Sequence, residues 1–445
     1  MVELTISEYG FIGCDNIDTN SNKFVSIRNI EASLFEELYN FWLNDKETQK
    51  VFTFENKKCL KATSYVGVIQ TENLSIEILP KTYTALNNIE THRHIFIEML
   101  KPLLNINELQ INRAHLSTTK NKNIYEMFIS LFIQSVDTLV HKGLKSQYIE
   151  KEDNQYFLKG KLKFNEHIKR NYIHKERFYV EFDEYLQDRI ENRLLKSTIA
   201  LLLKKSNDVE NKKRLRQQLS LFDDINLSNN YDIDFKKVNV HRGMEYYSLP
   251  LQFSELFLKH KSFTSLRGKE DVFALLFPME KVFENYMQFV LNNSKTNLGI
   301  TSVIPNGYNG DYLLKNGKCE MTNQQPDYLL EMKDNSIIIS DAKWKLLDIS
   351  SNNTKKCKED EKVNISSNDA YQLFSYLNYY DAQKVAYVFV PNTDITKEIM
   401  LEYIKGQDKK IKIVPIDLER LVHPDNRHIL KDNIFHNSLE LGAVS

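Results

Sequence analysis

The sequence predicts a mixed α/β protein with more than one domain, and three observations support this fold class. The chain has 445 residues, more than one hydrophobic core usually organises. Of these residues, 42% are hydrophobic and 11% are aromatic, enough for sizeable cores. Strand-like alternation and helical apolar spacing both recur along the chain. We expect an N-terminal mixed α/β domain over 1–110, a mostly helical middle region over 111–260 and, over 261–445, a mixed sheet flanked by helices.

Local patterns place the first elements within this scheme. The apolar spacing of residues 30–42 predicts a helix. Residues 65–69 and 74–79 predict two strands joined by a polar turn. From residue 91 onward the pattern is mostly helical, with segments at 91–100, 124–141 and 185–205. The Asn- and Asp-rich stretch 223–234 predicts a hinge before the last domain.

Charge and cysteine usage exclude several functional classes. Lys and Arg number 59 against 60 Asp and Glu, a net charge of -1, so any nucleic-acid contact must be local. Cys14, Cys59, Cys319 and Cys357 form no CxxC pair, which argues against a structural zinc site or a disulfide framework. The spacing of His92, His94 and His115 fits no zinc geometry either.

The sequence indicates a cytoplasmic protein with no membrane contact. The N-terminus lacks the basic start and apolar run of a signal peptide. The most apolar long stretch, 124–140, is interrupted by Glu126, Gln134 and Asp137, which predicts a buried helix and not a membrane span.

A cluster of charges is expected at one end of a hairpin in the last domain. Residues 326–332 and 337–343 predict two strands joined by a turn at 333–336. Antiparallel pairing about this turn puts Asp327 across from residue 341 or 342. Side chains alternate along a strand, so Asp341 and Lys343 share a face. Two carboxylates and one ammonium are thus predicted to converge.

These groups suit metal-assisted hydrolysis of a phosphodiester. Mg²⁺, for which Mn²⁺ could substitute, prefers carboxylate and carbonyl oxygens, here Asp327, Asp341 and the carbonyl of Ala342. The metal acidifies a water, and Lys343 can orient that water or stabilise developing negative charge. The alternative is that all three charged residues are ordinary surface or strand-end residues.

Neighbouring elements add further candidates to this site. Residues 278–290 predict an amphipathic helix on which Glu280 and Glu284 share one face, and either could assist the metal or be a solvated surface residue. Residues 369–380 predict another helix, with Gln372 and Tyr376 one turn apart. Buried strands are expected at 384–391 and 411–416, where Pro415 favours an edge or the end of a strand.

The charged motif resembles that of the PD-(D/E)XK nuclease superfamily. Pro326 and Asp327 match its first half, and Asp341, Ala342 and Lys343 match its second. Gln372 and Tyr376 match the QxxxY element of the RecB-like branch. The resemblance implies a restriction-endonuclease-like mixed sheet, with Gln372 and Tyr376 beside the catalytic site, contacting DNA or Lys343.

Most of the chain also resembles the McrC family, the nuclease subunit of McrBC-type modification-dependent restriction systems. The matching stretches are 65–69, 76–81, 158–162, 167–168, 181–185, 192–196 and 279–284. The resemblance implies GTPase stimulation, DNA cleavage and a hexameric AAA+ GTPase partner of the McrB kind. The N-terminal half, with domain 1–110 as the expected docking domain, would meet this partner. It assigns the helix glutamate of the family to Glu284. The polar segment 350–368 departs from the pattern by its length and predicts a mobile loop.

The sequence itself supports a separate motor, because it contains no G-x-x-x-x-G-K-[ST] phosphate loop. Two rival interpretations stay open. A stand-alone RecB-like repair nuclease would cut DNA without a GTPase, and a non-catalytic adaptor would only activate the motor.

A basic and aromatic segment lies in the middle region. Ten Lys and Arg residues fall between His141 and Arg177, interleaved with Tyr148, Tyr156, Phe157, Phe164 and Tyr172. Such a segment could contact DNA through lysines and stacked rings, contact the AAA+ partner, or have no binding role.

Overall fold

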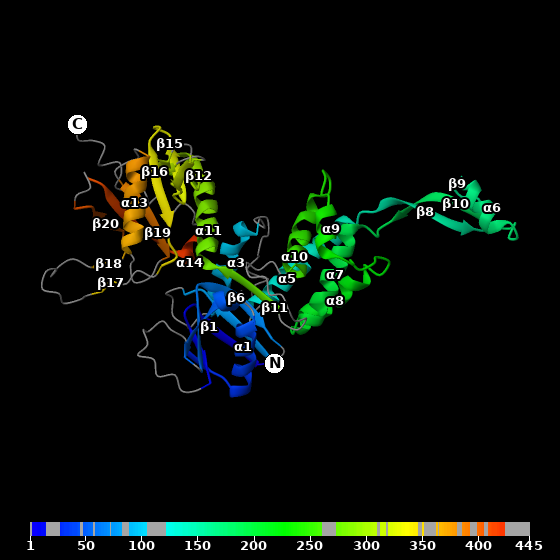
Figure 1. Ribbon diagram of the computed structural model, residues 1–445, viewed down its shortest axis with the longest axis horizontal. Coiled ribbons are helices and arrows are strands. Elements are labelled where there is room, and N and C mark those ends of the chain that lie inside the picture. The colour runs from blue at the N-terminus through cyan, green and yellow to red at the C-terminus, as the bar shows by residue number, and fades with distance from the viewer. Residues whose placement is uncertain are drawn as a thin grey trace. The chain divides into compact units, whose positions relative to one another are not determined.

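A computed structural model describes residues 2–14, 27–44, 48–56, 58–71, 73–81, 89–104, 122–259, 273–308, 312–316, 319–345, 349–350, 362–363, 365–380, 385–391, 398–404 and 408–422. The chain forms two compact units. Unit 1 combines Met1–Asn121 with Leu266–Ser445, and unit 2 is Lys122–Ser265. Helices and several sheets are present, which confirms the mixed α/β class (Figure 1). In the described part of the chain, no helix is both long and apolar enough to cross a membrane.

The N-terminal part of unit 1 is built on two four-stranded sheets. The first has the order β1-β7-β6-β11, and the second has the order β3-β2-β5-β4. Their strands are β1 (Val2–Ser7), β2 (Phe11–Gly13), β3 (Ile27–Asn29), β4 (Phe52–Asn56), β5 (Cys59–Ala62), β6 (Tyr65–Gln70), β7 (Leu74–Leu79) and β11 (Phe273–Pro278). The helices are α1 (Ala32–Asn44), α2 (Thr48–Val51) and α3 (Ile89–Leu103). The predicted helix at 30–42 and hairpin at 65–79 are both confirmed.

Strand β11 explains why unit 1 does not follow the predicted domain division. It belongs to the predicted third domain, 261–445, yet it pairs antiparallel with β6 of the first domain, 1–110. Gly67 of β6 has a positive φ of 141°, and a Cβ there would lie 1.9 Å from the carbonyl oxygen of Leu275. Only glycine permits this close approach of the two strands. The first and last parts of the chain therefore share one sheet.

The C-terminal part of unit 1 is a six-stranded mixed sheet with the order β12-β15-β16-β19-β21-β20. Its strands are β12 (Ile300–Pro305), β15 (Tyr328–Met332), β16 (Ile337–Ala342), β19 (Val385–Pro391), β20 (Ile399–Glu402) and β21 (Lys410–Ile416). Strand β19 runs parallel to both β16 and β21. The strand β20 pairs with β21 only as far as Ile413, so Pro415 lies near the end of β21, beyond that ladder, as expected.

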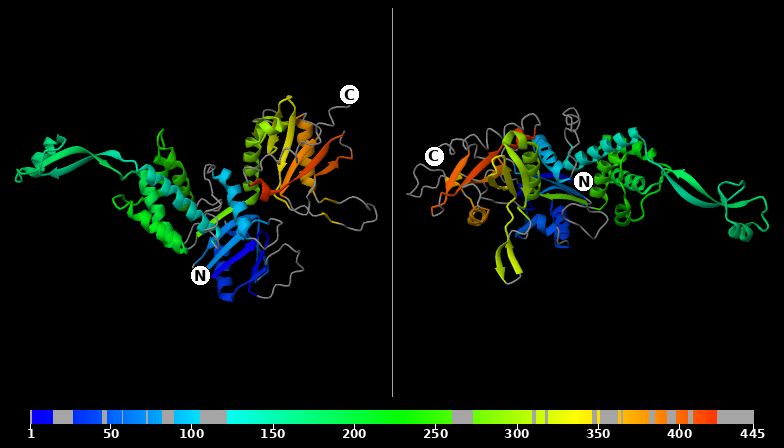
Figure 2. Two further views of the ribbon diagram at one scale, coloured as in Figure 1. Left: turned by 180° about the vertical axis from the view of Figure 1, so that it is seen from behind. Right: turned by 90° about the horizontal axis from the view of Figure 1, so that it is seen from above.

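Helices cover both faces of this sheet. Helices α11 (Met279–Asn293) and α13 (Ser367–Tyr379) lie on opposite sides of it (Figure 1). Leu373 and Leu377 of α13 pack with Ile339 of β16 in one buried cluster. Helix α11 contacts β12 and β16. The remaining elements are α12 (Lys295–Leu298), α14 (Leu418–Leu421), the ribbon β13 (Tyr312–Asn316) and β14 (Cys319–Asn323), seen in yellow in the right-hand view of Figure 2, and the pair β17 (Ile349–Ser350) and β18 (Lys362–Val363).

Unit 2 consists of a helical body and an extended arm. The body contains α5 (Ile124–Lys142), α7 (Ile190–Lys205), α8 (Val209–Ser220), α9 (Tyr231–Lys237), the 3₁₀ helix η1 (Glu245–Tyr247) and α10 (Ser248–Leu258). The arm, residues 147–186, contains β8 (Gln147–Gln155), β9 (Lys161–Leu162), α6 (Phe164–Asn171) and β10 (Phe178–Leu186), and it reaches away from the helices (Figure 1). The predicted helix at 185–205 begins only at Ile190, because its first residues end strand β10.

The stretch predicted to be a hinge, 223–234, is instead tied to the helical body, so that prediction is wrong. Asp188 accepts hydrogen bonds from the backbone N–H and the side-chain amide of Asn226, at 2.9 and 2.7 Å. Lys196 Nζ donates to the carbonyl oxygen of Ile225 at 2.6 Å. A segment with these anchors cannot act as a flexible connection.

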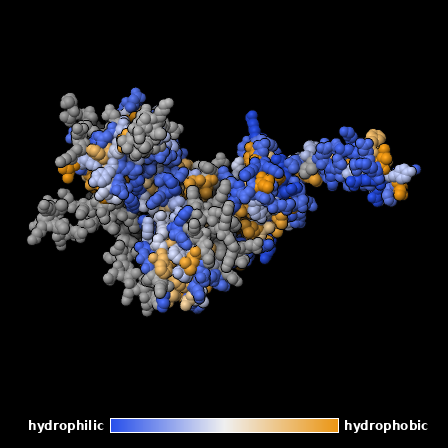
Figure 3. Space-filling view, viewed as in Figure 1, coloured by the Kyte–Doolittle hydropathy of each residue, from blue (hydrophilic) through white to orange (hydrophobic). Residues whose placement is uncertain are grey.

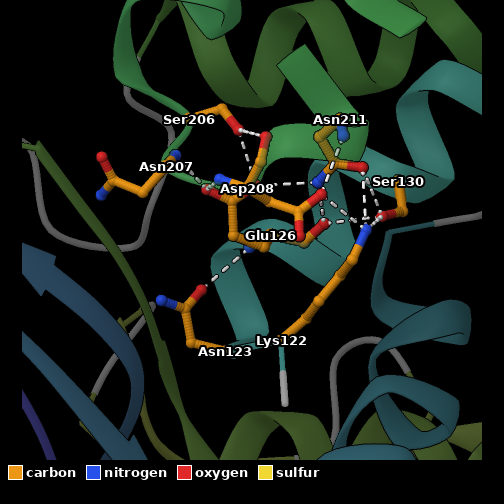
Figure 4. A network of polar contacts seen from close by, with 8 residues as sticks. All are labelled: Lys122, Asn123, Glu126, Ser130, Ser206, Asn207, Asp208 and Asn211. Atoms are coloured by element: carbon orange, nitrogen blue, oxygen red, sulfur yellow. Dashed lines mark hydrogen bonds and ion pairs between the residues drawn. The ribbon is translucent and has the colours of Figure 1, made fainter. Parts of the chain in front are cut away.

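A buried carboxylate organises the helical body. Glu126 of α5 is 4% exposed and accepts hydrogen bonds from Ser206 Oγ, Asn207 N and Asn211 Nδ2, at 2.8, 2.6 and 2.7 Å (Figure 4). Lys122 Nζ lies 2.9 Å from a carboxylate oxygen of Asp208, the N-cap residue of α8. The network therefore fixes the start of α8 against α5.

Acidic residues balance the basic residues of the arm. Residues 147–186 contain eight Lys and Arg and eight Asp and Glu, because β10 adds acidic residues after the basic stretch. Lys151 pairs with Glu184 at 3.1 Å, and Lys163 pairs with Glu181 and with Glu152, the latter at 2.9 Å. The arm thus presents paired charges and not a uniformly basic surface.

The far end of the arm has hydrophobic residues at its surface, among hydrophilic ones (Figure 3). Seven large apolar side chains there are between 59% and 82% exposed: Tyr156, Phe157, Leu158, Phe164, Ile168, Tyr172 and Ile173. We refer to these seven residues as the arm tip. Contiguous exposed apolar residues at one place usually mark an interaction surface.

Candidate active site

The β15–β16 hairpin forms as the sequence predicts. Its turn contains Asn335 with a positive φ of 64°, a conformation that Asn tolerates better than most residues. Tyr328 pairs with Ser340, and Leu329 pairs with Ile339. One step further along this register, Asp327 lies opposite Asp341. This register agrees with the prediction, which placed Asp327 across from residue 341 or 342.

Both aspartates lie on the sheet face that α13 covers. Leu329 and Ile339 pack in the cluster that contains the α13 leucines, and alternation places Asp327 and Asp341 on their side. Tyr328, between Asp327 and Leu329, points the other way, and its hydroxyl donates to the backbone carbonyl of Glu284 in α11 at 2.6 Å. The hairpin thus brings the two carboxylates to the same side of the sheet.

The carboxylates of Asp327 and Asp341 make short contacts, but not every oxygen of the pair is hydrogen-bonded. Asp327 Oδ2 accepts a hydrogen bond from Ala342 N at 2.8 Å. Lys343 Nζ forms an ion pair with Asp341 Oδ2 at 2.7 Å, and Asp341 Oδ1 has no hydrogen-bond partner among the described residues. Asp341 is only 1% exposed. Buried carboxylate oxygens normally have partners, so Asp341 Oδ1 calls for an explanation.

Electrostatics agree with this geometry. Burial, and next the charge of Asp341, raise the pKa of Asp327 to about 8. Burial alone would lower the pKa of Lys343, but the carboxylate of Asp341 raises it above its usual range. Lys343 is therefore a cation at neutral pH and cannot accept a proton. Without a metal cation, Asp327 is therefore largely protonated at neutral pH, and the pair carries about one negative charge beside one ammonium.

The QxxxY pair lies beside the two aspartates. Gln372 Nε2 donates to Tyr376 Oη at 2.7 Å, and the Tyr376 hydroxyl donates to the carbonyl oxygen of Gln325 at 2.9 Å. Burial, together with the charges of Asp341 and Asp327, raises the pKa of Tyr376. Helix α13 therefore ties the chain just before Asp327 to the face of the sheet that bears the carboxylates.

The two glutamates of α11 have different surroundings. Glu284 pairs with Lys281 Nζ at 2.6 Å, and this contact raises the pKa of Lys281. The negative charge of Asp327 raises the pKa of Lys281 further. Glu280 instead acts on Glu8 and Lys81 of the N-terminal part. Of the two, Glu284 is the one near the aspartates. Even so, no group of three or more His, Cys, Asp and Glu in the described ranges could hold a metal. Helix α11 covers the opposite sheet face, so Glu284 does not join the pair.

The residues present fit a small divalent cation. Asp341 offers two buried oxygens, of which Oδ1 has no hydrogen-bond partner among the described residues, and Asp327 stands opposite it. Carboxylate oxygens with room for water are the donor set that Mg²⁺ prefers. A bound cation would also offset the repulsion from Asp341 that, after burial, raises the pKa of Asp327.

Two further residues near Lys343 were not singled out from the sequence. Lys345 forms an ion pair with Asp369 in the first turn of α13, and the charge of Asp369 also acts on Lys343. The Asp341-x-Lys343-x-Lys345 alternation puts both lysines on one side, which could have indicated Lys345. A pocket at this place is lined by Asp341, Lys343, Lys345, Ile365, Asp369, Leu373, Val388, Val390 and Ile413.

Other sequence candidates lie elsewhere. His92 is buried in α3, and His94 on the same helix lies 3.8 Å from Glu98. His115 lies outside the described residues, as do Cys357 and most of the predicted loop at 350–368.

The chain is similar to known proteins over most of its length. The model of a family described as "McrBC 5-methylcytosine restriction system component" matches residues 60–390. No curated protein matches the chain.

Two solved structures from Thermococcus gammatolerans are similar to it. One is a chain of the refined half-complex from a tetradecameric assembly of McrB AAA+ hexamers with bound McrC. It is 20% identical with a TM-score of 0.68, and the match covers 96% of this chain and 98% of that one. The other is a chain of the cryo-EM structure of the McrBC complex, 22% identical with a TM-score of 0.50, covering 66% of this chain and 88% of that one. At these identities the likeness is one of fold.

Proposed function

Because the chain belongs to the McrC family of McrBC 5-methylcytosine restriction system components, we propose that it is a DNA endonuclease subunit that works with an AAA+ GTPase hexamer. In this proposal it cuts DNA by Mg²⁺-dependent hydrolysis and stimulates the GTPase of its partner. The observation that carries the nuclease assignment is the buried pair Asp327 and Asp341, whose one ion-pair partner within 3 Å among the described residues is Lys343.

Each residue of the site has a role that follows from its surroundings. Asp327 and Asp341 would hold the cation, with the carbonyl of Ala342 as a further oxygen ligand. When bound, Mg²⁺ supplies positive charge to the phosphate and a more acidic water. Lys343 stays protonated, so it orients the water or stabilises charge and does not act as the base. Gln372 and Tyr376 orient the substrate, and Glu284 assists from α11 only if DNA or metal binding draws it away from Lys281.

The nuclease assignment is tested with Asp341→Ala in the presence of the AAA+ partner, GTP and Mg²⁺. We expect double-strand cleavage to fall by roughly 10³-fold or more while GTPase stimulation is retained, because the change removes a metal ligand only. Asp334→Ala is the matched control, since Asp334 is an exposed carboxylate in the turn of the same hairpin.

The same assay separates the rival functions. Retained cleavage by the Asp341→Ala protein would refute the assignment. Cleavage by the wild-type chain without any GTPase would favour a stand-alone repair nuclease. GTPase stimulation without cleavage, even by the wild-type complex, would identify an adaptor.

The arm tip is the surface that we assign to the AAA+ partner. Residues 147–186 as a whole have balanced charges, but residues 156–177, which contain the arm tip, have seven Lys and Arg against two Glu, so charge alone does not distinguish DNA from a protein partner. The exposed apolar residues favour a protein surface, because association buries apolar area that would otherwise remain in water.

Polar substitutions test this assignment. Phe157→Ser and Ile173→Ser should each weaken GTPase stimulation about tenfold or more, since anchoring apolar residues of an interface contribute about 1–2 kcal/mol or more. Val209→Ser is the matched control, because Val209 is 81% exposed on α8 of the helical body. Stimulation that is unchanged in both arm variants would contradict the assignment.

A further inference from the structure

We infer that Glu8, in the N-terminal part of the chain, is a positioning residue for Lys343, an inference that rests on the proposed nuclease function. Glu8 follows strand β1 and is 2% exposed. Its Oε1 and Oε2 lie 3.1 and 3.0 Å from Nε1 of Trp344, and both accept from that indole N–H. Oε2 also accepts from Lys81 N at 2.8 Å. The two side chains are 336 positions apart in the sequence.

Trp344 directly follows Lys343, so this contact acts at the candidate site. Trp344 is 3% exposed, and its ring packs on Phe283 of α11 with centroids 5.4 Å apart. On the other side, Lys343 N donates to the carbonyl oxygen of Phe389 in β19 at 2.9 Å. The backbone at Lys343 is therefore held by β19, while the next side chain is held by α11 and by Glu8.

A carboxylate is an unfavourable residue for this buried position if its role is only structural. A buried carboxylate is costly, and an apolar pair of similar size would fill the space at least as well. Lys81 and Glu280 face Glu8, and burial raises the pKa of Glu8 to about 7 despite the hydrogen bonds that it accepts. A carboxylate in this place fixes the direction of the indole N–H, which packing alone does not. Fixing Trp344 in turn limits where the Lys343 ammonium can lie relative to Asp341.

The test compares variants in the complete complex with the AAA+ partner, GTP and Mg²⁺. Glu8→Leu removes the acceptor, and we expect kcat for cleavage to fall by roughly 10- to 100-fold, the range for residues that orient a site through another residue. KM for DNA and GTPase stimulation should stay within about twofold of the wild-type values, because no binding surface changes. Glu8→Gln keeps an oxygen for the indole and should restore most of kcat.

Glu77→Leu is the matched control for loss of a buried carboxylate. Glu77 lies in β7 of the same sheet, is 3% exposed, and binds Arg93 and Thr5, not the segment 341–345. It should lower thermal stability at least as much as Glu8→Leu and leave kcat nearly unchanged. If Glu8→Leu does not fold, Trp344→Phe serves instead, because it removes the N–H and keeps an aromatic ring, although a smaller one. Glu8→Gln combined with Trp344→Phe should be no slower than Trp344→Phe alone.

A spectroscopic signal checks the contact itself. The chain has two tryptophans, so Trp344 can be observed alone in a Trp42→Phe background. Its emission should change in Glu8→Leu and not in Glu77→Leu. Unchanged kcat or unchanged emission in Glu8→Leu would overturn the inference while leaving the nuclease proposal intact. A wild-type complex that cannot cleave DNA would overturn both.

Discussion

Asp327→Asn should abolish DNA cleavage and, at the same time, make the metal-free protein more stable. Cleavage should fall by about 10³-fold, because the amide is a poor ligand for a divalent cation. In the folded chain, burial and Asp341 raise the pKa of Asp327 to about 8, so folding stability falls as the pH rises from about 4 to about 8. The amide removes this cost, and we expect the free energy of unfolding at pH 7 to rise by up to about 4 kcal/mol. Denaturant unfolding across this pH range would measure it.

Magnesium provides the internal control for this prediction. Added Mg²⁺ should raise the Tm of the wild-type chain, because a ligand that binds only the folded state stabilises it. The Asp327→Asn chain should show little or no such rise. The prediction fails if the variant is less stable than the wild type in the absence of metal, or if both chains respond to Mg²⁺ equally.

Glu126→Ala should destabilise unit 2 by about 3–5 kcal/mol, the usual cost of breaking a buried charged network by removing one partner. The donors from Ser206, Asn207 and Asn211 would lose their acceptor in a region closed to water. The start of α8 would then keep only its N-cap, Asp208, and the contacts of Asn211 with Lys122, Ser130 and the carbonyl of residue 126. A lower Tm and faster hydrogen exchange at residues 206–211 would be the measured signs.

Two variants define the limits of this effect. Glu126→Gln keeps one acceptor and should cost clearly less than Glu126→Ala. Glu210→Ala removes an exposed carboxylate from the first turn of α8 and should change stability by no more than about 0.5 kcal/mol. Equal losses for Glu126→Ala and Glu210→Ala would show that the network does not stabilise the unit.

The centre of the candidate site was predictable because its geometry is local. The position of the turn at 333–336 sets the register between 326–332 and 337–343, and side-chain alternation along a strand sets the face of each side chain. Asp327, Asp341 and Lys343 follow from that alone. Glu284 did not follow, because which face of the sheet a helix covers depends on packing that its own pattern does not encode.

Other features escaped prediction for physical reasons. The arm strand β8 consists mostly of charged and polar residues, so it shows no hydrophobic alternation. The pairing of β6 with β11 and the contact of Glu8 with Trp344 join residues that are far apart in the chain. No local pattern identifies such partners.

The pairing of β6 with β11 has a consequence for how the protein is made. A ribosome synthesises β6 some 200 residues before β11. The first sheet therefore lacks strand β11 until the whole of unit 2 has been synthesised. During that interval an unsatisfied strand edge is exposed to other nascent chains. A gene truncated near residue 260 would therefore yield an aggregation-prone product and not an independent N-terminal module.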